Sequence, residues 1–173
     1  MTSEVPVLVI TGTMGSGKTT MLGEASDLLA ARGIVHAAVD LDTLGMGHLP
    51  EPPWTELPYR NLAAVWQNYA AAGAKRLLMA EAVEDADELN HIREAIPGVQ
   101  IVVCRLTASL DIMRQRVSLR EPGMLRETFV ARVAELEALI DTAALEDFSV
   151  PTDDGRTVTQ AALEMLSAAT WIT

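Results

Sequence analysis

Short apolar stretches alternate along this chain with longer stretches that have helical spacing. Residues 5–11 are mostly apolar and β-branched, as in a strand that is buried on both faces. Residues 18–32 contain no proline and carry apolar residues at helical spacing, at Met21, Leu22, Ala25, Leu28 and Leu29. A strand followed by a helix, repeated along a chain, predicts a parallel sheet with helices on both of its faces.

The same criteria predict the remaining elements. Strands are expected at residues 5–11, 34–41, 76–80, 100–106 and 148–150. Helices are expected at residues 18–32, 59–72, 86–95 and 125–143, together with one that ends at Leu119 after a cap at Thr107 or Ser109, and one from Thr157 or Thr159 to near Trp171. Glycine and proline are frequent between residues 45 and 58, which predicts an irregular loop. The expected fold is therefore an α/β domain, residues 1–173, built on a five-stranded parallel sheet.

A glycine-rich loop separates the first strand from the first helix. It reads G-T-M-G-S-G-K-T and matches G-x-x-x-x-G-K-[ST] at every position. The glycines allow a tight turn whose N–H groups point at one anion, and the following helix adds its positive N-terminal end. Lys18 would reach the β- and γ-phosphates of a nucleotide, and the Thr19 hydroxyl would bind Mg²⁺. The predicted nucleotide-binding residues of this loop are Gly12, Thr13, Met14, Gly15, Ser16, Gly17, Lys18, Thr19 and Thr20.

Composition narrows the classes of function. The formal net charge is −11, and binding to a nucleic acid polymer needs clustered lysine and arginine, so such a partner is not expected. No stretch has the length and apolarity of a membrane span, and the N-terminus has no signal-peptide pattern. The single cysteine, Cys104, lies in an apolar run and is expected in the core. These features together predict a cytoplasmic protein without a membrane partner.

Two aspartates follow the second predicted strand. Ligands of open parallel sheets bind beyond the carboxyl ends of the strands, where Asp40 and Asp42 are expected. Alternation along an extended strand would place both carboxylates on one side of the sheet. One carboxylate could then serve the Mg²⁺ shell, and the other could accept a proton from a substrate hydroxyl or orient it. The alternative is that both aspartates only cap the next turn.

Arginines surround the turn at Pro122-Gly123. Arg116 and Arg120 are spaced i, i+4 and share one face of a helix. Guanidinium groups can stack on adenine and neutralise charge on a transferred phosphoryl group, so residues 116–128 are predicted to form a short lid. The alternative is a solvated basic face, including Arg114 and Arg126, that pairs with Glu121 and Glu127.

These motifs give the chain a resemblance to the P-loop small-molecule kinases of the adenylate-kinase-like and shikimate-kinase-like group. The group includes gluconate kinase, adenylylsulfate kinase and chloramphenicol phosphotransferase. Asp40-Leu41-Asp42 resembles the D-x-D of shikimate kinase, which implies that Asp40 serves the metal and Asp42 binds the substrate hydroxyl. Arg116 and Arg120 resemble the R-x-x-x-R that enters the lid. The resemblance implies that Arg116 lies against adenine and that Arg120 reaches the phosphates.

The resemblance extends to the last strand and has clear departures. Residues 150–157 resemble the loop that flanks adenine, which implies nucleotide contacts for Thr152 and Asp153. The glycine pair that holds the carboxylate of shikimate is missing after the third strand, where the chain reads Ala-Glu-Ala, so shikimate is not expected as the substrate. A Walker-B aspartate is also missing there, and whether Glu81 takes that place stays open.

The acceptor is expected over residues 43–72, between the second and third strands. Arg60 could bind an anionic acceptor, and Trp54 or Tyr59 could cover an apolar or ring-shaped one. Trp66 and Tyr69 are interpreted as core residues. His48 is interpreted as a surface residue of the loop, although a role in the site stays open.

The predicted function is phosphoryl transfer from ATP to a hydroxyl group of a small molecule, with ATP and Mg²⁺ as cofactors. Lys18, Asp42 and Arg120 are the predicted catalytic residues. Two alternatives remain, an ATP-binding or ATP-hydrolysing regulatory module without an acceptor, and an inactive kinase fold that serves as an interaction domain. The sequence leaves the identity of the acceptor and the oligomeric state open.

Overall fold

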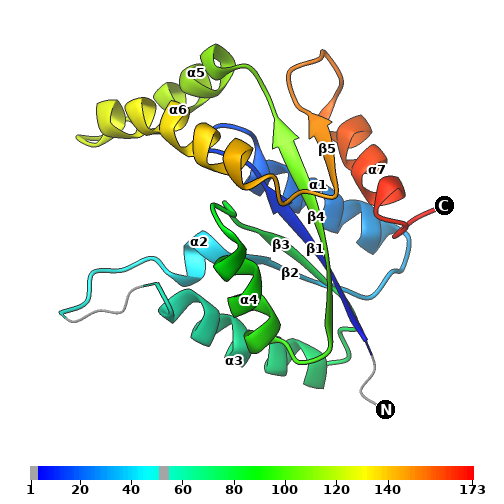
Figure 1. Cartoon of the computed structure of the whole chain (residues 1–173). Coiled ribbons are helices and arrows are strands. Elements are labelled where there is room, and N and C mark those ends of the chain that lie inside the picture. Colours follow the sequence, from blue (N-terminus) through cyan, green and yellow to red (C-terminus); the bar gives the residue numbers. More distant parts are fainter. Residues whose placement is uncertain (1–3, 51–54) are drawn as a thin grey trace.

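The computed structural model describes residues 4–50 and 55–173 (Figure 1). Its strands are β1 (Val5–Thr11), β2 (Ala37–Asp40), β3 (Leu77–Ala80), β4 (Val99–Thr107) and β5 (Phe148–Pro151). Its helices are α1 (Lys18–Ala31), α2 (Leu41–Leu44), α3 (Leu57–Ala71), α4 (Ala86–Ala95), α5 (Leu110–Arg120), α6 (Arg126–Ala143) and α7 (Val158–Ala168). The strands pair in parallel in the order β2-β3-β1-β4-β5, which confirms the predicted five-stranded parallel α/β sheet.

Two apolar clusters lie on opposite faces of the sheet. Leu8 and Ile10 of β1 pack into the cluster under α1 and α7, whereas Val7 and Val9 pack into the cluster under α3 and α4. Side chains along a strand alternate between its faces, so a central strand covered on both sides is apolar throughout. Figure 1 shows these helix pairs on the two sides of the sheet. The packing explains why the first strand was predicted with its observed bounds.

Helices α5 and α6 form a hairpin beside the loop that follows β1 (Figure 1). Its small core consists of Met113 and Val117 on α5 and Val133 on α6, and Met14 of the glycine loop packs against them. The buried hydroxyl of Thr13 donates to the carbonyl of Val133 at 3.3 Å. The hairpin is therefore attached directly to the glycine loop.

A buried arginine ties α6 to β4. Arg105 lies on β4, where its side chain is 7% exposed, and its guanidinium pairs with Glu137 at 2.7 Å, Asp141 at 3.0 Å and Glu146 at 3.4 Å. Charged groups are stable inside a protein when they are paired in this way. The network holds α6, and with it the hairpin, in place beside the sheet.

The prediction that Asp40 and Asp42 alternate along the end of the second strand was wrong. The chain leaves β2 at Asp40 and turns at once into the short helix α2, which begins at Leu41 and contains Asp42. The buried side chain of Leu41 packs with the cluster under α3, and this contact fixes the turn. Asp40 and Asp42 therefore do not alternate along one extended strand. The other predicted bounds lie within a few residues of the observed ones.

The two aromatic residues of α3 that the sequence placed in the core behave differently. Trp66 is buried at 7% exposure, as predicted, but Tyr69 is 42% exposed and the prediction for it was wrong. Trp66 and Leu62 are four residues apart and lie on the buried face of α3. The side chain of Tyr69 is turned toward the solvent.

Two expectations from composition concern the core and the membrane. Cys104 is fully buried in the cluster under α1 and α7, which confirms its prediction as a core thiol. Burial raises the pKa of its thiol to about 12, so the reactive thiolate is disfavoured.

Among the helices of residues 4–50 and 55–173, none combines the length and the apolar character needed to span a bilayer.

Candidate active site

The glycine loop has a backbone that only glycine adopts readily. Gly12, Gly15 and Gly17 have φ values of 147°, 82° and 100°. A Cβ atom on Gly15 would lie 2.4 Å from the carbonyl oxygen of Met113, and one on Gly12 would lie 2.8 Å from that of Leu106. The loop therefore needs all three glycines for its conformation, and Gly12 and Gly15 also for the close contacts with β4 and α5.

The glycine loop and the start of α1 also carry groups that can donate hydrogen bonds to an anion. Gly17 occupies the N-cap position of α1 and has no side chain to cap it, so the first N–H groups of the helix keep their capacity to bind an anion. The hydroxyl of Ser16 is buried without a hydrogen-bond partner. The Nζ of Lys18 donates to the carbonyls of Gly12, at 2.8 Å, and Thr13, at 3.4 Å. Polar groups in this arrangement fit the terminal phosphates of a nucleotide.

Thr19 and Asp40 meet at the carboxyl edge of the sheet. The Thr19 hydroxyl donates to Oδ2 of Asp40 at 2.8 Å, although the two residues are 21 positions apart. The second oxygen of Asp40, Oδ1, is buried and has no hydrogen-bond partner. Mg²⁺ prefers such oxygen ligands and usually keeps several waters and phosphate oxygens besides. The two residues therefore fit the magnesium site expected from the sequence.

Helix α2 carries Asp42, an exposed residue whose carboxylate interacts electrostatically with Lys18. Burial raises the pKa of Asp42, and the charge of Lys18 opposes this shift. Burial lowers the pKa of Lys18, and Asp42 and Asp40 oppose that shift. A carboxylate whose pKa is raised is a better proton acceptor than a free one. The structure thus brings Asp42 to the loop by a different local geometry from the one predicted.

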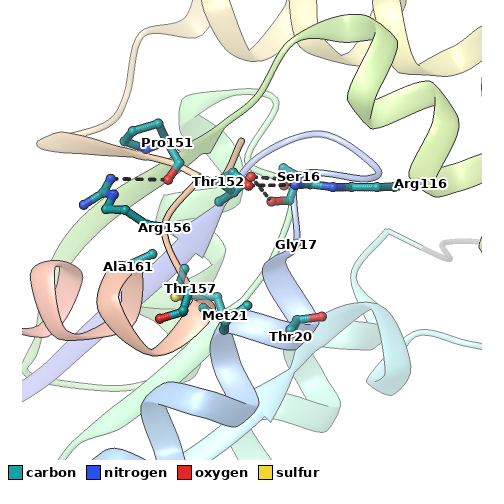
Figure 2. Close-up of a pocket in the computed structure, with 11 residues that line it drawn as sticks. Ser16, Gly17, Thr20, Met21, Arg116, Pro151, Thr152, Arg156, Thr157 and Ala161 are labelled. Atoms are coloured by element: carbon teal, nitrogen blue, oxygen red, sulfur yellow. Dashed lines mark hydrogen bonds between the residues drawn. The ribbon is translucent and has the colours of Figure 1, made fainter. Parts of the chain in front are cut away.

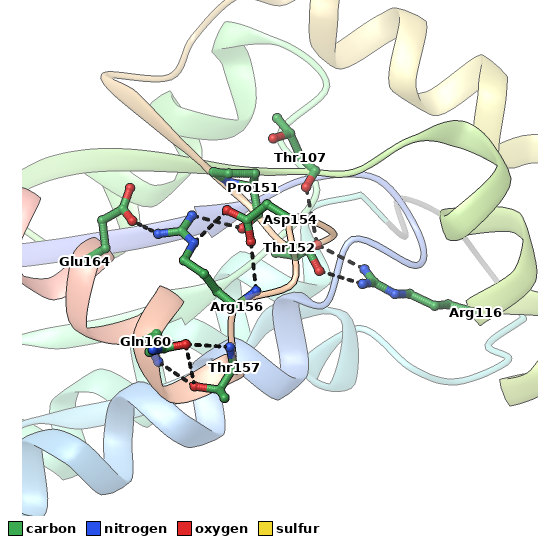
Figure 3. A network of polar contacts seen from close by, with 9 residues as sticks. All are labelled: Thr107, Arg116, Pro151, Thr152, Asp154, Arg156, Thr157, Gln160 and Glu164. Atoms are coloured by element: carbon green, nitrogen blue, oxygen red, sulfur yellow. Dashed lines mark hydrogen bonds and ion pairs between the residues drawn. The ribbon is translucent and has the colours of Figure 1, made fainter.

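The two arginines of α5 have different partners. Arg116 donates to the carbonyl of Gly15 at 3.1 Å, and to the hydroxyl and the carbonyl of Thr152 at 3.0 and 2.7 Å (Figure 3). Arg120 is 59% exposed and pairs with Glu121 at 3.0 Å, as in the alternative of a solvated basic face. Its charge nevertheless acts on both Lys18 and Asp42. Arg116 thus joins the glycine loop to the loop after β5, while Arg120 stands at the edge of the site.

A hollow of about 210 Å³ lies between these two loops (Figure 2). Its described lining comes from the glycine loop, α1, α5, the loop after β5 and α7: Ser16, Gly17, Thr20, Met21, Arg116, Pro151, Thr152, Arg156, Thr157, Val158 and Ala161. The Thr152 hydroxyl also donates to the carbonyl of Ser16 at 2.9 Å. Beside the phosphate-binding loop, a mixed apolar and polar hollow of this kind fits a nucleobase.

Two residues of the loop after β5 depart from the sequence-based picture. Asp153 does not line the hollow, because its carboxylate accepts a hydrogen bond from the N–H of Ser109 at 2.8 Å, at the start of α5. Arg156 does line it, and ion pairs with Asp154 and Glu164 hold its side chain (Figure 3). The sequence reasoning missed Arg156, since a single arginine in a polar loop carries no spacing signal.

The predicted acceptor residues separate into different places. Asp42 lines a cleft of about 340 Å³ together with Tyr59 and Glu81. Arg60 is exposed and lies in a neighbouring hollow with Glu56 and Glu94, so the structure does not bring it beside Asp42. His48 and Trp54 were two further candidates in the same segment. His48 is exposed on the loop after α2, and Trp54 lies outside the described residues.

Glu81 is buried directly after β3, next to the glycine loop. It is 6% exposed, and its backbone N–H donates to the carbonyl of Ile10 at 3.1 Å. Its Oε1 accepts a hydrogen bond from the Tyr59 hydroxyl at 2.5 Å, whereas its Oε2 has no partner. Burial raises the pKa of Glu81 to about 8, with a smaller opposite effect of the Tyr59 hydrogen bond. The sequence singled out Glu81 and Tyr59 separately but gave no sign that they touch.

The raised pKa of Glu81 predicts a pH-dependent stability. An unfolded chain ionises a glutamate near pH ~4.3, whereas the folded protein keeps this carboxyl protonated until about pH 8. The unfolded state therefore binds fewer protons across this window, and the wild-type free energy of unfolding should fall as the pH rises. In Glu81→Gln this contribution is absent, so the variant should gain stability relative to wild type from about pH 5 to about pH 8. Urea unfolding curves at several pH values measure the difference.

The matched control is Asp27→Asn, which alters an exposed carboxylate of α1 on the other side of the sheet. Its stability should follow the pH dependence of the wild type. Parallel curves for the wild type and Glu81→Gln would contradict the prediction.

Solved structures of other proteins share this fold. The strand order β2-β3-β1-β4-β5 and the glycine loop between β1 and α1 form the fold of the P-loop small-molecule kinases. A gluconokinase from Sinorhizobium meliloti 1021 is 16% identical with a TM-score of 0.63, over 96% of this chain and 92% of that one. The APS kinase from Mycobacterium tuberculosis, solved with AMPPNP and APS, is 19% identical with a TM-score of 0.66, over 95% and 96%. The shikimate kinase from Acinetobacter baumannii, solved with shikimate, is 18% identical with a TM-score of 0.59, over 96% and 94%. These similarities confirm the resemblance predicted from the motifs.

Comparison of the sequence with curated proteins gives matches that cover less than half of the chain. No model of a known protein family matches the chain. Imidazole-4-carboxamide isomerases from two strains of Xylella fastidiosa, M23 and Temecula1, are 36% identical over 86 residues, or 43% of this chain. The chain spans 32% of the length of these curated relatives, so their activity is not carried over to it.

Proposed function

We propose that this protein is an ATP-dependent kinase that transfers the γ-phosphoryl group of ATP to a hydroxyl group of a small molecule. One observation carries the proposal: the glycine loop directly follows β1 and Asp42 lies in the helix that directly follows β2, so both stand at the carboxyl edge of the sheet. A carboxylate beside a phosphate-binding loop is the arrangement that in-line transfer to a hydroxyl needs.

In this proposal the adenine occupies the hollow beside Arg116 and Thr152, and the phosphates occupy the glycine loop. Thr19 and Asp40 would hold Mg²⁺, which when bound neutralises charge on the phosphates. Lys18 and Arg120 stabilise the charge of the transferring group. The proposed nucleotide contacts of Asp153 would require its carboxylate to leave the N–H of Ser109.

The acceptor enters through the cleft that Asp42 lines. A bond forms between the acceptor oxygen and the γ-phosphorus while the bond to the β,γ-bridging oxygen breaks and ADP leaves. Asp42 orients the hydroxyl and accepts its proton, which then passes to solvent. In this proposal Thr55, Pro58 and Tyr59, from the segment 43–72 expected to bind the acceptor, form one wall of the cleft. Arg60 contacts only an acceptor that reaches the neighbouring hollow. Residues 116–128 act as the lid.

The test combines nucleotide binding with a screen of acceptors. Calorimetry with Mg²⁺ and a non-hydrolysable ATP analogue should show binding to the wild-type protein. Incubation with Mg²⁺-ATP and a panel of hydroxyl compounds should give ADP formation that depends on the acceptor, together with a phosphorylated product detected by mass spectrometry. Binding followed by hydrolysis that no acceptor accelerates would support the regulatory module instead, and absence of nucleotide binding would contradict both.

A further inference from the structure

The cleft beside Asp42 is strongly acidic. Six acidic residues are among those of its lining that the structure describes: Asp42, Glu81, Glu84, Asp85, Asp87 and Glu88. In that same described lining there is no lysine or arginine, and His91 is the one residue that could carry a positive charge. A cleft lined by one sign of charge concentrates ligands of the opposite sign and repels those of its own sign.

Some of these carboxylates have structural roles. Asp85 and Glu88 form the capping box of α4, and Glu84 lies 3.6 Å from the guanidinium of Arg132. Acidic residues at the start of a helix are favourable without any ligand. The negative charge of the cleft by itself is therefore no evidence for a binding site.

Glu81 differs from these residues, because it neither caps α4 nor pairs with Arg132. It is 6% exposed and lines the cleft, and its Oε2 is buried without a hydrogen-bond partner. Tyr59 holds the other oxygen at 2.5 Å, and its ring stacks on that of His91 with centroids 4.9 Å apart. A buried carboxyl oxygen without a donor is costly unless a ligand supplies that donor. Tyr59 thus holds the side chain in place at the wall of the cleft, while its second oxygen has no partner within the described residues.

The choice between a metal ion and an organic cation follows from the arrangement of the carboxylates. In the part of the chain that the structure describes, no three histidine, cysteine, aspartate or glutamate side chains are grouped so as to hold a metal ion. An ammonium group carries three N–H donors and needs no fixed coordination polyhedron, so it can pair with carboxylates that are spread along a wall.

We infer, on the basis of the proposed kinase function, that the phosphate acceptor is a cation: a hydroxyl compound with a protonated amino group. The protonated amine replaces the proton that Glu81 otherwise keeps until about pH 8, and this proton passes to solvent. The amine then donates to Oε2 of Glu81 and is attracted by the other carboxylates of the cleft, and this places a hydroxyl of the same molecule beside Asp42. An anionic acceptor bound by Arg60, as considered from the sequence, would lie in the neighbouring hollow, away from Asp42.

The experiment uses three linear six-carbon polyols that differ in one end group: glucamine with an amine, sorbitol with a hydroxyl and gluconate with a carboxylate. Each is titrated calorimetrically into the full chain with Mg²⁺ and the non-hydrolysable ATP analogue. Glucamine should bind about tenfold or more tightly than sorbitol, as a charge-assisted hydrogen bond to a buried group implies. Gluconate should bind more weakly than sorbitol, and added salt should reduce the differences.

Two variants locate the effect. Glu81→Gln keeps the size of the side chain and an acceptor oxygen for Tyr59, and should bring the affinities for glucamine and sorbitol within about twofold of each other. Asp27→Asn removes one negative charge on the far side of the sheet and should keep the wild-type preference. Circular dichroism verifies that both variants are folded, and the wild-type series tests the inference even if Glu81→Gln does not fold.

The outcomes separate this inference from the proposed function. Equal affinity for the three polyols, no detectable binding of any of them, or a preference for gluconate would overturn the inference. Displacement of glucamine by Mg²⁺ alone, in a manner that depends on Glu81, would overturn it in favour of a metal site. In each of these cases, binding of the ATP analogue and acceptor-dependent ADP formation would leave the kinase function standing.

Discussion

Asp42→Asn is expected to reduce the rate of phosphoryl transfer by about 10²- to 10⁴-fold, the usual contribution of a positioned general base. Asparagine has nearly the same shape but cannot take up the proton of the acceptor hydroxyl. Desolvation raises the pKa of the Asp42 carboxyl although the residue is exposed on α2, and this direction favours the role of a proton acceptor. Binding of ATP should stay close to that of the wild type, because the backbone of the glycine loop is unchanged. Steady-state kinetics with an acceptor and calorimetry with the ATP analogue measure the two quantities.

The control for this prediction is Asp27→Asn, which makes the same chemical change on the exposed side of α1. Its transfer rate should equal that of the wild type. An unchanged rate in Asp42→Asn would remove Asp42 from the mechanism. Loss of ATP binding together with transfer would show instead that Asp42 acts by supporting the glycine loop.

Lys18→Met should lower the rate of transfer by about 10²- to 10³-fold, as the loss of one preorganised charged donor to the transition state does. Methionine fills a similar volume but carries no charge for the β- and γ-phosphates. The variant also loses the hydrogen bonds from Nζ to the carbonyls of Gly12 and Thr13, at 2.8 and 3.4 Å, so weaker ATP binding is expected as well. Single-turnover kinetics at saturating ATP separate the loss of rate from the loss of affinity.

The chain contains its own matched control, since Lys75 is its other lysine and is exposed just before β3. Lys75→Met should leave both rate and affinity unchanged. If Lys18→Met retained the wild-type rate, the proposed position of the phosphates in the glycine loop would be wrong. If both lysine variants lost activity equally, the effect would report a general change of surface charge.

The sheet could be predicted because its information is local. A parallel strand that is covered on both faces is apolar throughout, and the helices between the strands carry their own spacing, so β1 and α4 were predicted with their observed bounds. The prediction failed where packing with a distant helix decided the backbone. Leu41 is drawn into the cluster under α3, and the resulting turn converts the end of the second strand into α2.

Some residues of the candidate site could likewise be predicted from the sequence, and others could not. The glycine loop is continuous in sequence, so its motif predicts the phosphate-binding residues without a structure. Glu81 and Tyr59 are 22 positions apart, and only the folded chain shows that they share a hydrogen bond in a cleft. The sequence likewise gave no reason to place Arg156 beside the nucleobase hollow or Arg60 apart from Asp42.

By itself, the sequence determined the parallel sheet and the glycine loop, because each depends on residues that are neighbours along the chain. The tertiary structure alone decided the surroundings of the cleft beside Asp42: the effect of the Lys18 charge, the unpartnered oxygen of Glu81 and the acidic wall. Burial and electrostatic potential depend on groups that come from separate strands and helices. Burial and potential therefore exist only after the chain has folded, and the inference about the charge of the acceptor depends on both.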